Sequence, residues 1–543
     1  MDDNIIRIMI TTDNHLGYKD KDLIRCDDSF AAFEEVLEKC KSSRADILLI
    51  AGDLFDENKP SRRTMHRTIE LLRKYCLGEE TVYLTCLNSP GDIIKNEYGN
   101  MNYENPFLSI SLPVISIHGN HDDPSKDGVK GEPLAALDIL ASCNLVNYIG
   151  KHDNIEEIEV RPLLFKKEDS FVAIYAVGNI RDERMNRLWK SKKFLFVQPT
   201  EEQGRSKFHC ILVIHQNRDY GRGSKNCIHE SMIPEWMDVV IWGNEHEAKP
   251  CLIDSLMGTY RIYQPGSSIA TSLNAGESSK HPKSFGLLEL KWMNGKKMRL
   301  TPFKYTQIRP FVYDEMNLQQ EAGLDPGDPR IEDKMKQMIT RKIQRMIQEA
   351  KEEELAPRDI NTEYKIKDPS LVLIRLKVDI QGFPSFSLVR FAQQFVGKVA
   401  NEDILIFSKK KATGDRERAT ETERNRGSHH TELLDAFEKG DEDAINLIKV
   451  EDLVNETINS SNKKLGILSE DLMATALSDF VNKKENAAII DAVKDTLESW
   501  QENLKRKVNF YINTNTYTHT YTYTNTNRWM KITCSTSKRR PVK

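Results

Sequence analysis

Residues 113–122, PVISIHGNHD, join a short run of apolar, β-branched residues to a cluster of Gly, Asn, His and Asp. A run with so little polar interruption is typical of a strand that is buried on both faces of a sheet. Similar runs are IIRIMI (5–10), DILLIAG (46–52), FHCILVIH (208–215), MDVVIWG (237–243) and TYRIYQPG (259–266). Segments with helical periodicity follow the first two runs in the sequence, 5–10 and 46–52. This alternation predicts a layered α/β domain.

Two segments between these runs have the apolar spacing of amphipathic helices. The first places Phe30, Phe33, Leu37 and Cys40 on one stripe. The second follows Pro60 and carries Met65, Ile69, Leu72 and Cys76. Stripes of this width usually pack against a protein core.

The composition excludes several classes of protein. The chain has 543 residues, more than the ~250–300 that one core usually supports, so we expect several domains. Its formal charge of −4 offers no general excess of cations, so an anionic substrate must be bound by local groups. No run of ~18 apolar residues occurs and the N-terminal residues are acidic, which argues against membrane and secreted proteins. The nine cysteines form no C-x-x-C pair, which argues against a zinc ribbon or a disulfide framework.

Changes of pattern along the chain divide it into five parts. We expect an α/β domain at 1–285 and a smaller α+β domain at 286–407, which contains a helix near 331–354 and the alternating run LVLIRLKVDI. Residues 408–430 are almost wholly polar and predict a linker. Residues 431–510 predict helices, with a narrow apolar seam at Ile490, Val493, Leu497, Trp500 and Leu504. We interpret 511–543, which include NTNTYTHTYTYTNTN, as a low-complexity tail that arose from a misassigned gene end.

Polar clusters stand at or directly after the ends of five predicted strands. They are Asp13-Asn14-His15, Gly52-Asp53, Gly119-Asn120-His121-Asp122, His215-Gln216-Asn217 and Gly243-Asn244-Glu245-His246. The carboxyl ends of strands in an open α/β sheet meet at one crevice, so we expect these clusters to converge. Carboxylates, imidazoles and carboxamides without thiolates suit Mn²⁺, Mg²⁺ or Fe²⁺. Two such ions that share a carboxylate, for which Asp53 is the natural candidate, would suit displacement at a phosphoester.

Six ordered motifs resemble those of the calcineurin-like metallophosphoesterases. They are DNHLG (13–17), GDLFDENKPSRRT (52–64), IHGNHDDP (117–124), HQNR (215–218), GNEHE (243–247) and QPGSS (264–268). Within that family, residues 5–510 are most similar to the eukaryotic meiotic-recombination nucleases of the double-strand-break repair complex. The resemblance implies a metallophosphoesterase β-sandwich flanked by helices, a small DNA-binding α+β capping domain and a C-terminal helical hairpin.

The resemblance also implies two Mn²⁺ ions per subunit and a set of residues that bind them. One ion would be held by Asp13, His15, Asp53 and His246, and the other by Asp53, Asn120, His215 and residue 244. His121 would stabilise the phosphate or protonate the leaving oxygen, and Asp122 would orient His121. The family has His at position 244, where this chain has Asn244. A carboxamide oxygen is a weaker donor than imidazole, so we expect the second ion to bind less tightly.

Further expectations concern DNA and protein partners. Candidate DNA contacts are Lys59, Arg62, Arg63, Arg218, Arg222, Arg375 and Lys377. By the resemblance, Met65, Ile69 and Leu72 would form a homodimer interface, and 86–112 would bind a nibrin-like regulatory subunit. The segment 431–510 would bind the coiled coil of an ABC-type ATPase, and the protein would reside in the nucleus.

The implied activity is a manganese-dependent DNA nuclease in double-strand-break repair and meiotic recombination. It would degrade duplex ends from 3′ to 5′ and cut single strands, including those of hairpins. A catalytically weakened DNA-end-binding scaffold is an alternative, because of Asn244. A phosphoprotein phosphatase is a second alternative, disfavoured because Glu57 follows Asp56 where such phosphatases typically have Arg.

Overall fold

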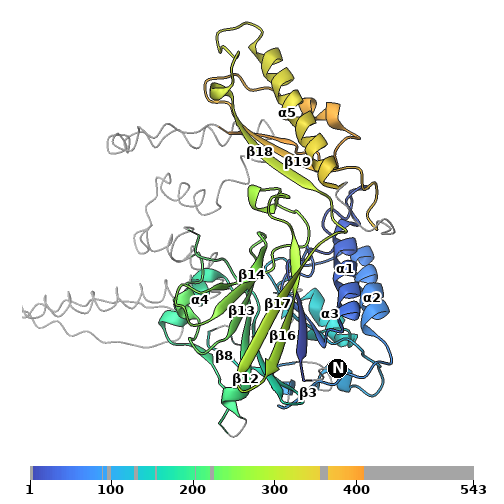
Figure 1. Cartoon of the computed structure of the whole chain (residues 1–543), viewed down its shortest axis with the longest axis vertical. Helices are drawn as coiled ribbons and strands as arrows, with labels where there is room; N and C mark the ends of the chain where they lie inside the picture. The colour runs from blue at the N-terminus through green and yellow to red at the C-terminus, as the bar shows by residue number, and fades with distance from the viewer. Residues whose placement is uncertain are drawn as a thin grey trace, which may run out of the picture. The chain divides into compact units, whose positions relative to one another are not determined.

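The computed structural model describes residues 4–408 except 89, 95–98, 127–132, 153, 155, 202–203, 221–225 and 355–364. Figure 1 shows two large sheets in one part of this region and a smaller sheet with helix α5 (Ile331–Glu354) in the other. Nearly all of the predicted linker, the helical segment 431–510 and the tail lie outside the described residues. Within the described part, no helix is both long and apolar enough to cross a membrane.

The first large sheet has the strand order β17-β16-β1-β2-β4-β7. The bounds are β1 (Ile6–Thr11), β2 (Ile47–Ala51), β4 (Val114–Ile117), β7 (Asn147–Tyr148), β16 (Ser284–Trp292) and β17 (Lys296–Lys304). Strands β1, β2, β4 and β7 are parallel, and β16 and β17 extend the sheet in antiparallel register.

The second large sheet has the order β14-β15-β13-β12-β10-β9-β3. The bounds are β3 (Thr85–Cys86), β9 (Leu163–Lys167), β10 (Ser170–Val177), β12 (Phe208–His215), β13 (Val239–Gly243), β14 (Lys249–Asp254) and β15 (Arg261–Gln264). All six predicted strands are therefore present. The sequence reading had missed β10, which lies between β9 and β12.

The two sheets pack face to face, and alternate residues of a strand enter different cores. Ile8 and Ile10 of β1 pack with Ile211 and Val213 of β12 between the sheets. Met9 faces the other way and packs with the helices outside the first sheet. Both faces of the strands are buried, which explains their continuous apolar sequences. This arrangement confirms the predicted sandwich.

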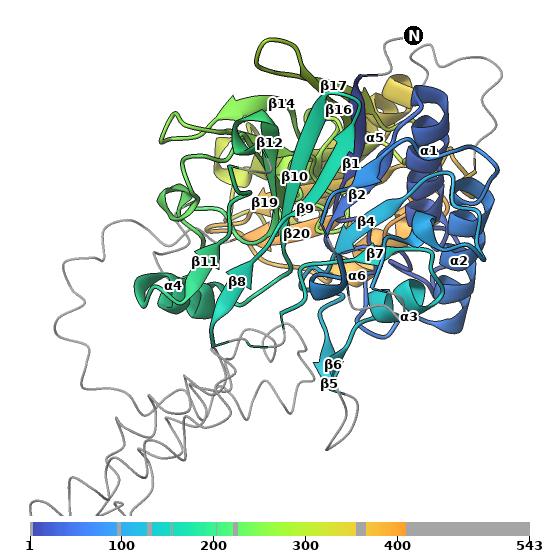
Figure 2. The ribbon, with the colours of Figure 1, turned by 90° about the horizontal axis from the view of Figure 1, so that it is seen from below.

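Helices cover the outer faces of the sandwich. Figure 2 shows α1 (Asp28–Ser43) and α2 (Arg62–Cys76) beside the first sheet and α4 (Asp182–Lys190) at the opposite side. The start of α2 is set by Ser61, whose hydroxyl accepts a hydrogen bond from the backbone N–H of Thr64 at 3.1 Å. The remaining short elements are α3 (Ala136–Ser142), β5 (Ser125–Lys126), β6 (Pro133–Leu134), β8 (Ile158–Val160) and β11 (Phe194–Phe196).

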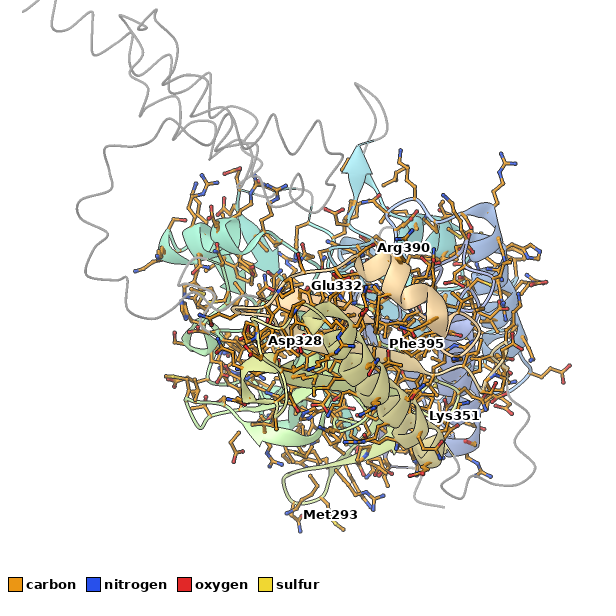
Figure 3. The ribbon with its side chains drawn as sticks, turned by 90° about the horizontal axis from the view of Figure 1, so that it is seen from above. Met293, Asp328, Glu332, Lys351, Arg390 and Phe395 are labelled. Atoms are coloured by element: carbon orange, nitrogen blue, oxygen red, sulfur yellow. The ribbon has the colours of Figure 1, made fainter. Side chains whose placement is uncertain are left out.

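The smaller module is a three-stranded parallel sheet covered by α5. Its bounds are β18 (Phe311–Asn317), β19 (Leu373–Asp379), β20 (Leu405–Ser408) and α6 (Leu388–Ala392). In β19 the buried residues alternate with Arg375 and Lys377, as the pattern predicted. Figure 3 shows Glu332 near the start of α5 and Lys351 near its end, where each charge complements the helix dipole.

The predicted domain boundary at residue 286 is wrong. Residues 284–304 form β16 and β17, and β16 pairs with β1 from Ile6↔Leu290 to Ile10↔Gly286. The two-sheet sandwich therefore extends to the end of β17, and the smaller module begins with β18. The alternation of GLLELKWM could not reveal this, because its partner strand lies at the other end of the domain.

Candidate metal centre

The predicted clusters meet at one edge of the sandwich, where β1, β2, β4, β12 and β13 end. Left-handed backbone conformations accumulate in the segments that follow these strands: Asp13 has φ 48°, His15 46°, Asp53 50° and Asn244 74°. Such conformations are uncommon for residues other than glycine and cluster at functional sites. Sharp backbone turns therefore direct these side chains into a common space.

Glycine allows the strand ends to approach closely. Gly52 has φ +95°, and a Cβ atom there would lie 2.3 Å from the imidazole of His215. A Cβ atom on Gly119 would lie 2.0 Å from an oxygen of Asp53. The left-handed backbone at Gly52 therefore makes a sharp turn before Asp53 and lets backbone and ligand side chains occupy neighbouring positions.

Asp13, His15 and His246 form the first group of candidate ligands. His246 Nε2 lies 3.5 Å from Asp13 Oδ1, and His15 Nε2 lies 3.9 Å from the same oxygen. His15 Nε2 is also 3.9 Å from Asp53 Oδ2. Asp53 thus faces this group as well as the next one.

The second group joins Asp53 to His215 and Asn120. His215 Nε2 lies 3.3 Å from Asp53 Oδ2 and 3.2 Å from Asn120 Oδ1. Ligand atoms of Asp13, Asp53 and His215 all lie within 4.8 Å of one another, as do those of Asp13, His15 and His246. The two groups therefore overlap at the carboxylates, as two metal ions with a shared ligand require.

Two buried polar atoms in this centre fit a bound cation. Asp13 Oδ1 and His15 Nε2 have no hydrogen-bond partner within the described part of the chain. Buried polar atoms are nearly always paired, and each exception needs a reason. A divalent cation beside them would satisfy both, and the oxygen and nitrogen donors suit Mn²⁺ or a similar ion.

The electrostatics of the centre favour positive charge. Burial acts to lower the pKa of His215, but the carboxylates of Asp53 and Asp13 outweigh it and raise this pKa to about 10. Burial likewise opposes protonation of His246, yet the nearby carboxylates of Asp13 and Glu277 raise its pKa to about 9. Burial disfavours the charged form of Asp13, but the surrounding imidazoles hold the pKa of Asp13 well below its usual range. The same carboxylates would attract a divalent cation, whose binding would displace protons from the imidazole nitrogens.

A second layer of residues orients the imidazoles. His215 Nδ1 lies 2.8 Å from the carbonyl oxygen of Ala51 and must donate to it, which directs Nε2 toward the carboxylates. His15 Nδ1 lies 3.1 Å from Asp56 Oδ1. His246 Nδ1 lies 3.0 Å from Thr271 Oγ1 and 3.3 Å from Glu277 Oε1.

Sequence reasoning missed these supporting residues. Asp56 stands within the second motif, three residues after Asp53, so its position was a usable signal. Thr271 and Glu277 follow the last motif without a recognisable pattern. Glu277 accepts a hydrogen bond from the buried Lys283 amine at 3.2 Å, and only the folded chain reveals this pairing.

The structure places His121 beside the centre and corrects the role of Asp122. His121 is partly exposed, and its Nδ1 donates to the backbone oxygen of Asp56 at 2.8 Å. Asp122 is fully buried and accepts from the backbone N–H groups of Gly119 at 2.7 Å and Phe55 at 3.2 Å. Burial and the nearby Asp53 raise the pKa of Asp122 to about 7. Asp122 therefore fixes the loop backbone, and the Asp56 carbonyl orients the His121 ring.

Asn244 lies at the border of the second group. Its backbone N–H donates to Asp13 Oδ2 at 3.0 Å, and its side-chain Nδ2 donates to Asn217 Oδ1 at 2.9 Å. Because the amide nitrogen is held by Asn217, only the side-chain oxygen could serve as a ligand.

The candidate DNA contacts differ in their environment. Lys59, Arg62 and Arg63 are exposed, and Arg63 pairs with Asp20 and Asp27. The prediction for Arg218 is wrong, because its buried guanidinium pairs with Glu230 at 2.9 Å and with Gln264 at 2.8 Å. Arg375 and Lys377 pair with Asp403 and Glu315, and Arg222 lies outside the described residues.

The candidate dimer contacts also differ in how deeply they are buried. Leu72 is fully buried within the single chain and packs in the core beneath α1 and α2. It is therefore a core residue, and its assignment to a dimer surface is wrong. Met65 and Ile69 are only partly buried and pack against the edge of the same core.

Comparisons with known proteins agree with these features. Residues 6–248 match the family model of the calcineurin-like phosphoesterases, and residues 298–480 match that of the Mre11 DNA-binding presumed domain. The chain is 39% identical over 518 residues to the double-strand break repair protein MRE11 of Oryza sativa subsp. indica, covering 93% of this chain and 68% of that protein. It is 39% identical over 513 residues to the Arabidopsis thaliana protein of that name, covering 92% and 65% of the two chains. It is 36% identical over 512 residues to the Homo sapiens protein, covering 93% and 68%.

The two family models match the two modules of the structure. The phosphoesterase match contains every candidate metal ligand, and the second match begins within β17 and continues through the smaller module. The chain spans about two thirds of the length of these relatives. With this extent of identity on a metallophosphoesterase fold, the chain belongs to the family of the double-strand break repair protein MRE11.

Proposed function

We propose that this chain is a manganese-dependent DNA nuclease that acts in double-strand-break repair and meiotic recombination. It would remove nucleotides from duplex ends in the 3′-to-5′ direction and cut single strands. The overlap of two ligand groups at Asp13 and Asp53, with the exposed His121 beside them, carries this proposal. Paired cations and a nearby proton donor are a combination that can catalyse the hydrolysis of a phosphodiester.

The residues fit two Mn²⁺ ions. Asp13, His15, Asp53 and His246 would hold one ion. The second would be held by Asp53, Asn120 and His215, with the side-chain oxygen of Asn244 as its weakest ligand. When bound, the ions would lower the pKa of water and neutralise the phosphate charge.

His121 would act on the substrate directly. Its Nδ1 is fixed by the Asp56 carbonyl, which leaves Nε2 to interact with the scissile phosphate or to pass a proton to the leaving oxygen. The ring lies edge-on to that of His15, with 4.8 Å between their centroids. The His121 ring is thus adjacent to a candidate metal ligand.

DNA would be bound through local cations and the smaller module. Lys59 and Arg62 are exposed beside the second motif and could contact phosphates near the centre. The match of 298–480 to a presumed DNA-binding domain supports a similar role for the smaller module.

Other expected partners follow the family. These are a second copy of this chain through the α1–α2 surface, a nibrin-like subunit at 86–112 and the coiled coil of an ABC-type ATPase at 431–510. Because its substrate would be broken chromosomal DNA, the protein would reside in the nucleus.

One observation favours a catalytically weakened scaffold as the second candidate. The Asn244 side chain is hydrogen-bonded to Asn217, so it offers the metal only a carboxamide oxygen. A weak second site would reduce hydrolysis while DNA-end binding persists.

Digestion of an end-labelled duplex with Mn²⁺, and with EDTA in its place, tests the proposal. We expect cleavage only with Mn²⁺, and a loss of roughly 10²–10⁴-fold in rate for His121→Ala. His281→Ala, which alters an exposed histidine outside both ligand groups, is the control and should retain full activity. Binding of the duplex without cleavage at saturating Mn²⁺ would support the scaffold and refute the nuclease.

A further inference from the structure

We propose that Asp219, Cys227 and His229 form a second, separate cation site, which takes a zinc-like ion. The three residues lie on the loop that follows β12 and share no member with the two ligand groups described above. This site is independent of the proposed nuclease activity.

The backbone brings the three residues together at the base of this loop. Arg218 and Ile228 form an isolated β-bridge, and the N–H of Ile228 donates to the carbonyl oxygen of Asn217 at 2.9 Å. Asp219 directly follows one bridged residue, and Cys227 and His229 flank the other. The ligand atoms of Cys227 and His229 both lie within 4.8 Å of that of Asp219 in this arrangement.

The ligand atoms are already close to the spacing that a metal ion imposes. His229 Nδ1 lies 3.1 Å from Asp219 Oδ2, and one ligand atom from each of the three residues lies within 4.8 Å of the others. Tetrahedral zinc, with bonds of ~2.3 Å to sulfur and ~2.0–2.2 Å to nitrogen or oxygen, needs ligand atoms roughly 3.3–3.7 Å apart. A small inward movement of side chains would complete the site.

The donor set indicates which ion would bind. Cys227 is fully buried and forms no disulfide, and His229 and Asp219 are partly exposed. A thiolate with an imidazole favours Zn²⁺ over Mn²⁺, which prefers oxygen donors. Binding would release the thiol proton of Cys227 to solvent. Glu230 is already held by Arg218 at 2.9 Å and by the Leu256 N–H at 2.6 Å, so the fourth position would be left to solvent.

A bound ion would fasten the loop beside the metal centre. Asn217, at the start of the loop, accepts from Asn244 Nδ2 and donates to Asp182 Oδ2 at 2.7 Å. The chain segment that carries His215 and Asn217 would then be tied to the segment 227–229 by the metal as well as by hydrogen bonds. The ion would therefore add to the stability of the pairing between these two segments.

Titration of the full chain with Co²⁺ after saturation with Mn²⁺ tests the proposal. Cobalt bound to a thiolate shows a sulfur-to-metal charge-transfer band in the near ultraviolet. The candidate metal centre contains no sulfur donor, so Co²⁺ there gives no such band. We expect the band to saturate at about one Co²⁺ per chain and to be lost on addition of one equivalent of Zn²⁺.

Matched variants assign the band to this site. Cys227→Ser should abolish it, and Cys251→Ser, which alters an exposed free cysteine, should leave it unchanged. If Cys227→Ser does not fold, His229→Gln and Asp219→Asn, at partly exposed positions, should each weaken Co²⁺ binding by 10-fold or more. The proposal is refuted if the band is absent at stoichiometric Co²⁺, persists in Cys227→Ser, or has the same affinity in the His229 and Asp219 variants.

Discussion

Replacing Arg309 by methionine should loosen the junction between the sandwich and the smaller module. The Arg309 side chain is buried, and each of its N–H groups has an acceptor. Nε donates to Asp28 Oδ2 at 2.8 Å, and Nη1 donates to the carbonyl oxygens of Asp368 at 2.8 Å and Leu371 at 3.0 Å. Nη2 donates to Ile24 O at 3.0 Å and to Lys367 O. One guanidinium thus binds the backbone of both modules.

The magnitude follows from what the substitution leaves unpaired. Methionine fills similar volume but donates nothing, so four carbonyl groups and the Asp28 carboxylate lose a donor. Among the residues that the structure describes, Arg25 is the cation left near that carboxylate, with its Nε 3.9 Å from Asp28 Oδ2. Removing one partner of a buried ion pair costs roughly 3–5 kcal/mol, and we expect a loss of that size in the free energy of unfolding.

The loss should depend on pH in a defined direction. Burial already raises the pKa of Asp28, and Arg309 opposes this rise. Without Arg309 the folded-state pKa of Asp28 rises further above the unfolded value, so folding of the variant is penalised above about pH 4, where the unfolded carboxyl ionises. The difference between wild type and Arg309→Met should therefore be smaller near pH 4 than near pH 7.

Urea unfolding and amide hydrogen exchange measure this effect. Exchange should accelerate in β18, β19 and α5 before it does in β1 and β2, because the junction is weakened first. Arg299→Met is the control, since Arg299 pairs with Glu289 on the surface and should cost ~1 kcal/mol or less. A loss below about 1 kcal/mol in Arg309→Met, with unchanged exchange in the smaller module, would refute the reasoning.

Three further predictions concern the metal centre, the helix core and the buried carboxylate of Asp27. Asn244→His should lower the Mn²⁺ concentration needed for half-maximal cleavage by roughly 10-fold or more, because imidazole is the stronger ligand; superimposable titration curves would contradict this. Leu72→Ala should reduce the free energy of unfolding by ~2–5 kcal/mol, and Met65→Ala by less, since only Leu72 is fully buried; equal losses in urea unfolding would argue against the assignment to the core. Asp27→Asn should cost about 1–3 kcal/mol near neutral pH. Burial opposes the charge of Asp27, but Arg67 and Arg63 hold its pKa below the usual value, so the difference should shrink as pH falls below about 4; a pH-independent difference would be evidence against these ion pairs.

Periodicity predicted the strands well where both faces are buried. β1, β2, β12 and β13 read as continuous apolar runs because each strand contributes to two cores. β10 is equally apolar but was missed, since it follows the charged turn that joins it to β9. Long-range pairing was not readable at all, as β16 shows by completing the first sheet beside β1.

The residue types and their positions at strand ends were enough to predict that these polar clusters gather in one place, and the family resemblance supplied the expected set of metal ligands. Asp13, Asp53 and His215 lie at or just after the carboxyl ends of β1, β2 and β12, each of which pairs in parallel with a neighbouring strand, so their convergence is a consequence of topology. The orientation of each imidazole was not predictable in this way. It depends on single atoms such as the Ala51 carbonyl and Glu277 Oε1, which approach only when distant segments pack together.

The amino-acid sequence therefore specified the family and the chemical types of the candidate ligands, because both depend on short motifs. It also specified the edge of the sheets at which the ligands gather, because that edge follows from the direction of the strands. The folded chain alone decided which atoms share a ligand group, that Arg218 and Leu72 are interior residues, and that the sandwich extends through β17. These properties depend on contacts between residues far apart in sequence, and no periodicity records such contacts.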